Sequence, residues 1–131
     1  MSSSDPIAEA KAVVRSHEEY AMAGDLDGVL SNIAEDIVLL AGGSPLVEGL
    51  ESFRGFYAEI LAIGDVEFGH DYSGGVTVGE LVILHGVSRG AFSTEEGEEI
   101  PFENNFIHTL RRGSDGRFMI WRAAFATATE A

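Results

Sequence analysis

Cysteine is absent from the 131 residues of the sequence. Disulfide bonds, thiolate nucleophiles and zinc sites built on cysteine are therefore excluded. Lysine is almost as scarce, because Lys11 is the only one, and the 8 basic side chains face 22 acidic ones, which gives a formal net charge of −14. Such a chain repels the phosphate backbone of nucleic acids and the surface of anionic membranes. We therefore exclude nucleic acid as a partner and interpret the acidity as a source of solubility.

Long apolar runs are also missing. No stretch approaches the roughly 20 apolar residues of a membrane-spanning helix, and the N-terminal MSSSDP has neither the basic nor the apolar segment of a secretory signal. Metal motifs such as HExxH do not occur, and Gly42-Gly43-Ser44 lacks the lysine of a phosphate-binding loop. The sequence predicts a soluble cytoplasmic protein that does not bind membranes and uses neither a metal nor a cofactor.

The remaining composition is that of a folded protein. Hydrophobic residues make up 45% of the chain and aromatic residues 9%, which is enough to build a core and too much for a disordered acidic segment. A chain of this length is about the size of one domain. We therefore expect residues 1–131 to form a single domain.

Three helices are predicted in the first half of the chain. Asp5 followed by Pro6 indicates a helix start, because the carboxylate caps the first turn and proline has the φ that this turn requires, and the helix extends to about Ala23. Asp25 caps a second, shorter helix, and a third spans residues 49–61. In the first helix, residues three and four positions apart form one buried face, which consists of Ala10, Val13, Val14, His17, Tyr20 and Ala21.

The second half of the chain alternates with the period of β-strands. Val66, Phe68, His70 and Tyr72 alternate with more polar residues, which indicates a strand with one dry face. The pair Gly74-Gly75 predicts a bulge or bend after it. Further strands over residues 81–92, 100–111 and 118–127 follow through short turns, so we expect an antiparallel meander. A short buried strand, Ile37–Leu40, precedes the third helix.

These elements predict an α+β domain in which a curved antiparallel sheet packs on three N-terminal helices. A long sheet that bends around helices makes a cone with an open mouth and an interior pocket. His70 and His85 lie on strands whose inward faces are left undetermined by the glycine pair, so they are not included in the predicted site. Glu35 and Asp36 are interpreted as surface or capping groups.

Three segments carry a family resemblance: AGDLDGVLSNIAEDIVLL, GGSPLVEGLESFRGFY and DGRFMIWRAAF. With them the chain resembles the SnoaL-like, or nuclear transport factor two-like, cone-shaped α+β proteins, which include ketosteroid isomerase and polyketide cyclases. The resemblance covers nearly the whole chain and implies the cone fold. It implies no single reaction, because the family includes isomerases, cyclases, dehydratases, hydrolases and non-catalytic modules.

Within that family, the spacing looks closest to ketosteroid isomerase, in which an Asp base works beside an oxyanion hole of a Tyr and a protonated Asp. The resemblance implies that His17 occupies the position of the oxyanion tyrosine, that Tyr57 is the tyrosine that supports it, and that His108 replaces the protonated aspartate. It places Ala41 at the position of the base, so the carboxylate that abstracts the proton is missing. A neutral imidazole can still serve as an acid or base near pH 7.

Strand alternation adds a set of pocket residues. If His108 faces the interior, Phe102, Asn104 and Phe106 share its side. The family register of the last strand adds Trp121, Ala123 and Phe125. Such an aromatic chamber with few polar groups is how small-molecule sites are built. His17 of the first helix and Trp121 have another interpretation, since each fits a packed core as well as a pocket.

Two functions remain open. The first is binding of a small apolar organic molecule, with His17, Tyr57 and His108 as candidate catalytic residues for cofactor-free isomerisation, cyclisation or dehydration of a carbonyl compound. The second is a non-catalytic ligand-binding or dimerisation module, which the alanine at position 41 favours. We expect a homodimer through the outer sheet face, with Ile107 and Val82 pointing outward.

Overall fold

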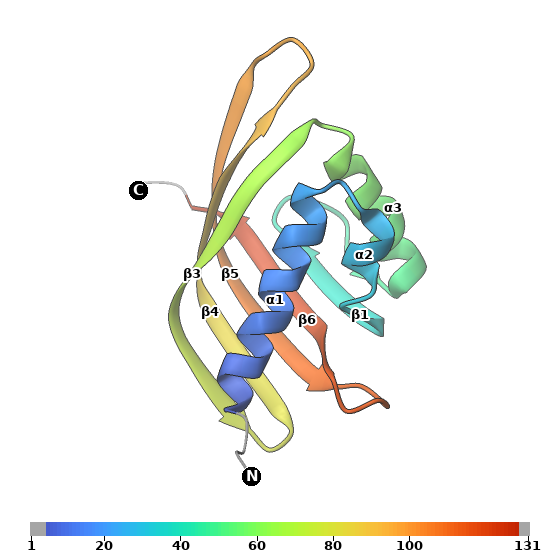
Figure 1. The fold of residues 1–131 in the computed structure, drawn as a ribbon, viewed down its shortest axis with the longest axis vertical. Helices are drawn as coiled ribbons and strands as arrows, with labels where there is room; N and C mark the ends of the chain where they lie inside the picture. Colours follow the sequence, from blue (N-terminus) through green and yellow to red (C-terminus); the bar gives the residue numbers. More distant parts are fainter. Residues whose placement is uncertain (1–4, 129–131) are drawn as a thin grey trace.

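A six-stranded sheet curves around three helices in the computed structural model, which describes residues 5–128 (Figure 1). The elements, in chain order, are α1 (Pro6–Met22), α2 (Leu26–Leu30), β1 (Ile33–Ala41), β2 (Val47–Glu48), α3 (Leu50–Leu61), β3 (Asp65–Val78), β4 (Leu81–Ser93), β5 (Glu99–Arg112) and β6 (Phe118–Thr127). The predicted α+β cone is confirmed. Residues 1–4, which belong to the N-terminal segment MSSSDP, lie outside the described residues.

The strand order is β2-β1-β6-β5-β4-β3. Strands β3 to β6 form the antiparallel meander that the alternating pattern predicts. Strand β1 adds to this meander in parallel with β6, and the two-residue β2, which the sequence did not predict, pairs with β1 on the other side. The first strand is also longer than expected, because α2 ends at Leu30 and Ile33 already belongs to β1.

Side-chain caps fix the starts of the first two helices. The carboxylate of Asp5 accepts a hydrogen bond of 3.0 Å from the backbone N–H of Ile7, and that of Asp25 accepts one of 2.9 Å from Gly28. The third helix begins after Gly49, whose φ of 88° lies in the left-handed region that glycine adopts without strain. These turns place α3 against the strands that enclose the interior.

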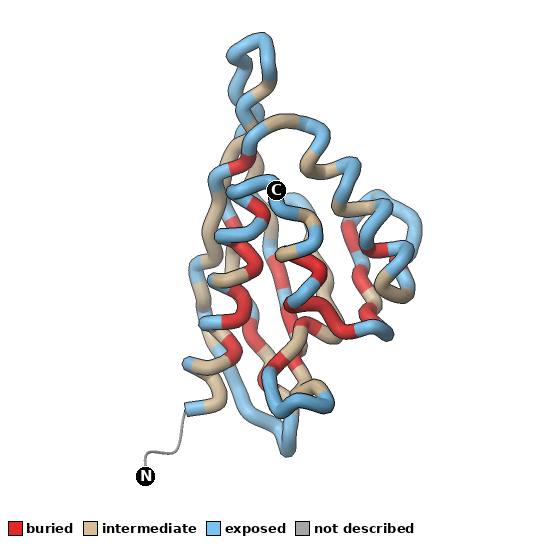
Figure 2. The backbone as a smooth tube through the Cα atoms, turned by 45° about the vertical axis from the view of Figure 1, so that its right-hand side comes forward, coloured by how far each residue is buried: buried red, intermediate tan, exposed pale blue. Residues whose placement is uncertain are grey.

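The core lies between α1 and the concave inner face of the sheet, and Figure 2 shows buried backbone where these two layers meet. The tip of the β4–β5 hairpin projects beyond this core and is exposed (Figures 1 and 2). None of the helices in residues 5–128 combines the length and the apolar character that crossing a bilayer requires.

Val82 corrects one expectation about the sheet. Its side chain is completely buried, whereas Ile107 is 47% exposed on the outer face. Val82 pairs with Leu110 and lies two residues before Leu84, which pairs with His108. Val82, Leu84, Leu110 and His108 therefore all point to the inner face. The outward placement predicted for Val82 is wrong, because a shift of one residue along a strand turns a side chain to the opposite face.

A bulge interrupts the first and the last strand pair of the meander, β3–β4 and β5–β6. In β3, the pairing with β4 shifts between Tyr72 and Gly74, as the pair Gly74-Gly75 predicts. In β6, the pairing with β5 shifts between Thr109 and Leu110, because Thr109 pairs with Arg122 and Leu110 with Ile120. The extra residue in β6 is Trp121, and the inward-facing positions change parity there.

Candidate functional site

An interior cavity of about 370 Å³ lies between α3 and the inner face of the sheet. Most of its wall is aromatic or aliphatic, and its few polar side chains include three histidines and one tyrosine. The lining residues are His17, Leu39, Ala41, Gly42, Ser44, Phe53, Phe56, Tyr57, Ile60, Ile63, Val66, Phe68, His70, Ser88, Phe92, Phe102, Asn104, Phe106, His108, Ile120, Ala123 and Phe125. An apolar chamber with few polar groups is the usual construction of a small-molecule site.

His17 reaches this cavity from α1. Its side chain is buried, and Nε2 lies 3.4 Å from the hydroxyl oxygen of Tyr57. Nδ1 is sealed from solvent and has no hydrogen-bond partner among residues 5–128. Burial, with a smaller contribution from the neighbouring His70, lowers the pKa of His17 to about 3. The imidazole is therefore neutral at physiological pH.

Tyr57 reaches the cavity from α3, where its ring stacks on Phe53 with 5.5 Å between ring centroids. The His17 ring meets it edge-on at the same separation. Burial raises the pKa of the Tyr57 hydroxyl well above its ordinary value. The hydroxyl therefore stays protonated at neutral pH and can donate a hydrogen bond to a ligand.

His108 stands on β5, between Leu84 of β4 and Ala123 of β6. It is buried, its ring lies 4.8 Å from that of Phe106, and its Nδ1 also has no partner in the described part of the chain. Burial, followed by the effects of His70 and His17, lowers the pKa of His108 well below its ordinary value. This imidazole is neutral as well.

The sealed Nδ1 atoms decide which nitrogen of each ring carries the proton. A buried N–H without an acceptor loses the hydrogen bond that it would make in water. We therefore assign the proton of His17 and of His108 to Nε2. The Nε2–H of His17 then donates to the Tyr57 oxygen, so the Tyr57 O–H remains free to donate into the cavity. The Nε2–H of His108 is a second donor on the cavity wall.

Two buried polar side chains at or beside the cavity were not included in the site predicted from the sequence. His70 of β3 lines the cavity, and its Nδ1 lies 2.5 Å from Oε2 of Glu18 on α1. Both side chains are buried, with exposed fractions of 5% and 9%. The alternation of Val66, Phe68 and His70 already indicated an inward histidine, since the bulge comes only after Tyr72. Glu18 lies four residues after the buried Val14, so helical spacing placed it at the edge of the buried face.

Most of the predicted pocket residues line the cavity. Ala41 is part of the wall from β1, Asn104 and Phe106 from β5, and Ala123 and Phe125 from β6. The position that a base would occupy by resemblance is therefore an apolar part of the wall. Ser88, Phe68 and Phe92, which were not predicted, contribute further wall from β3 and β4.

Trp121 corrects another expectation, because it does not line the cavity. The bulge in β6 turns it to the other side of the sheet, and Ile120 takes the inward place. There its Nε1 donates a hydrogen bond of 3.1 Å to Asp36, and the guanidinium groups of Arg111 and Arg122 lie over its ring at 4.6 and 4.1 Å. The hydrogen bond from Trp121, with the neighbouring Arg111, lowers the pKa of the exposed Asp36.

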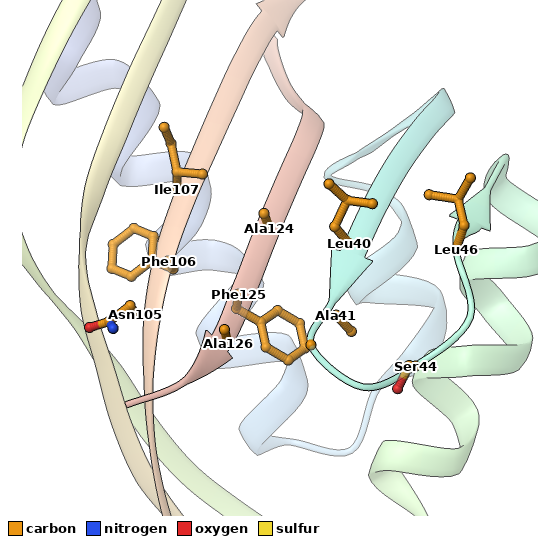
Figure 3. Close-up of a pocket in the computed structure, with 11 residues that line it drawn as sticks. Leu40, Ala41, Ser44, Leu46, Asn105, Phe106, Ile107, Ala124, Phe125 and Ala126 are labelled. Carbon is orange, nitrogen blue, oxygen red and sulfur yellow. The ribbon is translucent and has the colours of Figure 1, made fainter. Parts of the chain in front are cut away.

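A second hollow of about 670 Å³ lies on the outer face of the sheet and is wide open to solvent (Figure 3). Leu40, Leu46 and Ile107 line it with exposed fractions of 55%, 53% and 47%. Its lining shares residues with the interior cavity where β1 ends, among them Ala41 and Phe125. The two hollows therefore meet at this end of the sheet.

The described residues contain no group of three or more His, Asp or Glu side chains arranged to hold a metal ion. The polar side chains that line the interior cavity belong to His17, Ser44, Tyr57, His70, Ser88, Asn104 and His108. Glu18 lies beside the cavity through its contact with His70.

A curved sheet that closes with three helices over an aromatic cavity defines the cone class of α+β proteins. The model of the SnoaL-like domain family matches residues 13–121, and the chain belongs to this family. No curated protein matches the sequence.

Solved structures share the fold at low sequence identity. A ketosteroid isomerase-like protein from Erwinia carotovora atroseptica aligns with a TM-score of 0.82 and 16% identity over 98% of this chain and 100% of its own. A candidate dehydratase of the NTF2-like family from Streptomyces avermitilis aligns with a TM-score of 0.84 and 14% identity, over 95% of this chain and 97% of its own. An NTF2-like protein with a cystatin-like fold from Novosphingobium aromaticivorans aligns with a TM-score of 0.74 and 15% identity, over 95% of this chain and 82% of its own. Identities this low establish the fold and leave the reaction open.

Proposed function

We propose that the protein binds a small, largely apolar organic compound with a carbonyl oxygen and transfers protons on it without a cofactor, as an isomerase or dehydratase does. The observation that carries this proposal is the convergence of Tyr57 and two neutral imidazoles on one apolar cavity. Ketosteroid isomerase-like and dehydratase descriptions among the structural neighbours support the same class of reaction.

The polar groups suit an oxygen that gains negative charge. His17 donates through Nε2 to the Tyr57 oxygen over a long hydrogen bond of 3.4 Å, and the Tyr57 hydroxyl then donates to the ligand. His108 supplies a second donor through Nε2. Donors that are fixed in a water-poor cavity stabilise an enolate oxygen without reorganising during the reaction. Because neither imidazole is charged, a neutral carbonyl compound fits the site better than an anion that would require a fixed positive charge.

Binding of 2-naphthol tests this proposal, since its hydroxyl imitates the oxygen of an enol on an apolar body. Naphthalene, which lacks the oxygen, serves as the matched ligand. We expect His17→Leu and His108→Leu to weaken 2-naphthol binding about 10-fold each, the equivalent of roughly one good hydrogen bond of 1.4 kcal/mol, and to leave naphthalene binding within about 2-fold. The exposed His85 lies outside the cavity, so His85→Leu is the matched control variant.

Fluorescence titration measures both affinities, and a thermal shift confirms that each variant is folded, because a ligand that binds only the folded state raises its apparent stability. An unchanged affinity for 2-naphthol in both cavity variants would remove the proposed roles of these histidines. A wild-type protein that binds neither ligand would remove the cavity as a binding site.

The outer hollow supports a second candidate function, which is dimerisation. It gathers three large exposed apolar side chains on one sheet face of a highly charged chain, and apolar patches of this kind mark interaction sites. A twofold dimer buries the same patch on both copies. We expect Ile107→Glu to shift the sedimentation of a dimer toward the monomer, and Ile100→Glu, an exposed residue near the hairpin tip, to leave it unchanged. A strict monomer at micromolar concentration of the wild type would contradict this candidate.

A further inference from the structure

We propose that Glu18 and His70 are the proton-transferring pair of the cavity, in which His70 takes a proton from the ligand through Nε2 and Glu18 acts as the positioning residue of its ring. The inference rests on the proposed function and names the base that Ala41 cannot supply. It is carried by the geometry of the pair and by the contrast with the two other imidazoles.

The pair spans two elements and is enclosed by both. Glu18 extends from α1, His70 from β3, and the contact of 2.5 Å between Oε2 and Nδ1 is short for a hydrogen bond. A carboxylate that is only 9% exposed needs a hydrogen-bonded partner to remain in place. Glu18 does not line the cavity, whereas His70 does. The carboxylate therefore lies behind the imidazole as seen from the ligand.

The contact fixes the orientation of the ring. With Nδ1–H donated to Glu18, the neutral form of the His70 ring carries its lone pair on Nε2. Nε2 of His70 makes no hydrogen bond within residues 5–128. Unlike Nδ1 of His17 and of His108, it is not sealed off by protein atoms. It therefore opens onto the cavity as an acceptor.

The other two imidazoles have the opposite arrangement. His17 and His108 both have a sealed Nδ1, and the assignment of their protons to Nε2 makes them donors. Of the three rings that line the cavity, only His70 presents a lone pair. Since the ring centroids of His70 and His108 are 5.3 Å apart, the base lies beside a donor, as removal of a proton next to a carbonyl group requires.

The resulting step is balanced in atoms and electrons. His70 Nε2 takes the proton from the carbon beside the carbonyl, the electron pair of the broken C–H bond forms a carbon–carbon double bond, and the carbonyl π pair moves to the oxygen. Tyr57 and His108 hydrogen-bond this oxygen, and the Glu18 carboxylate balances the imidazolium. Return of the proton to a different carbon completes an isomerisation. Transfer of the proton to a departing β-hydroxyl, which leaves as water, completes a dehydration.

The elimination of 5-nitrobenzisoxazole tests the base without knowledge of the natural substrate. In this reaction a base removes the ring C–H proton, the N–O bond breaks, and a coloured nitrophenolate with a nitrile group forms. We expect saturable turnover by the wild type. His70→Gln should lower kcat by about 100-fold or more, the scale of general base catalysis, with KM within about 2-fold, and His85→Gln should equal the wild type.

Glu18→Gln tests the positioning role, since it keeps the shape and removes the charge. We expect kcat to fall by about 10- to 100-fold, as removal of a group that orients a functional side chain commonly does. Nitrogen-15 NMR of histidine-labelled protein adds a readout that needs no ligand. In the wild type the His70 signals should show the proton on Nδ1, and in Glu18→Gln a substantial share should move to Nε2.

The outcomes separate the two proposals. Wild-type turnover that survives His70→Gln places the base elsewhere and overturns the inference, as does a wild-type His70 with its neutral proton on Nε2. Binding of 5-nitrobenzisoxazole without turnover also overturns it and leaves the ligand site standing. Failure to bind this compound, 2-naphthol and naphthalene removes the proposed function itself, and with it the role of the pair.

Discussion

Acid should destabilise the fold through His17 and His108, whose buried imidazoles are neutral in the folded protein. Burial lowers the pKa of His17 to about 3, whereas in the unfolded chain a histidine titrates near 6.5. Between these values the unfolded chain binds a proton that the folded protein does not bind, so stability falls as the pH falls from about 6.5 toward 3. His108, whose pKa is lowered for the same reason, acts in the same direction.

The size of the effect follows from the two pKa values. At pH 5, protonation of one histidine stabilises the unfolded chain by RT ln(1 + 10^1.5), which is about 2 kcal/mol, against about 0.2 kcal/mol at pH 7. His108 adds a further loss in the same direction, and the contribution of His17 alone is already a large share of the roughly 5–15 kcal/mol of a typical domain. The ordinary pKa values of Asp and Glu lie below 5, and a pH of 5 stays above the isoelectric point of 4.4. This window therefore reports mainly on imidazoles.

Urea unfolding at pH 7 and pH 5 measures the loss. We expect the wild type to lose more than about 2 kcal/mol between pH 7 and pH 5, and His17→Gln, which removes one of the two groups, to lose about 2 kcal/mol less than the wild type. The exposed His85 provides the control His85→Gln, whose loss should equal that of the wild type. If His17→Gln and the wild type lose the same free energy, His17 is not held neutral by burial, and the assignment of its proton to Nε2 falls with it.

Four further substitutions test core packing, close backbone contact and helix capping, each by urea unfolding at pH 7. Leu84→Ala empties a completely buried position and should cost about 2–5 kcal/mol; a cost below about 1 kcal/mol would contradict its place in the core. Gly86→Ala should cost about 1–3 kcal/mol, because a Cβ there overlaps the Asp71 carbonyl oxygen, while Gly69→Ala, with open space around it, should cost less. Asp5→Ala removes the cap of α1 and should cost about 1 kcal/mol.

Local chemistry made much of the fold predictable. The Asp5-Pro6 start of α1 and the alternation from Val66 to Tyr72 are short-range signals that one sequence contains in full. The bulge at the glycine pair was predictable for the same reason, since glycine weakens regular pairing. The parallel addition of β1 to β6 was not, because it joins residues about 85 positions apart in the chain, and no local pattern encodes such a pairing.

The site was predictable where a residue lies on a simple repeat. His108 is inward because it lies two residues from Phe106 on the same strand, and Tyr57 is inward on α3. Glu18 is different, since a carboxylate at the edge of a helix face is ordinarily exposed, and only the contact with His70 of β3 explains its burial. Val82 and Trp121 show a third case, in which one residue of register decides the face, and the register depends on pairing with a neighbouring strand.

The extra residue in β6 changes which residue numbers face inward along this strand. Before Trp121, even positions such as Phe118 and Ile120 face inward, and after it the odd positions Ala123 and Phe125 do. Deleting Trp121 would remove the bulge and leave both halves of β6 facing as they do now, because Leu110 already pairs with Ile120 and Thr109 with Arg122. Deleting Ala124 instead would keep the bulge and turn the residues beyond the deletion to the opposite face, so that Phe125 would point to the outer hollow. The same strand should therefore accept the loss of one residue at the bulge and lose its cavity wall when the residue is removed a few positions later.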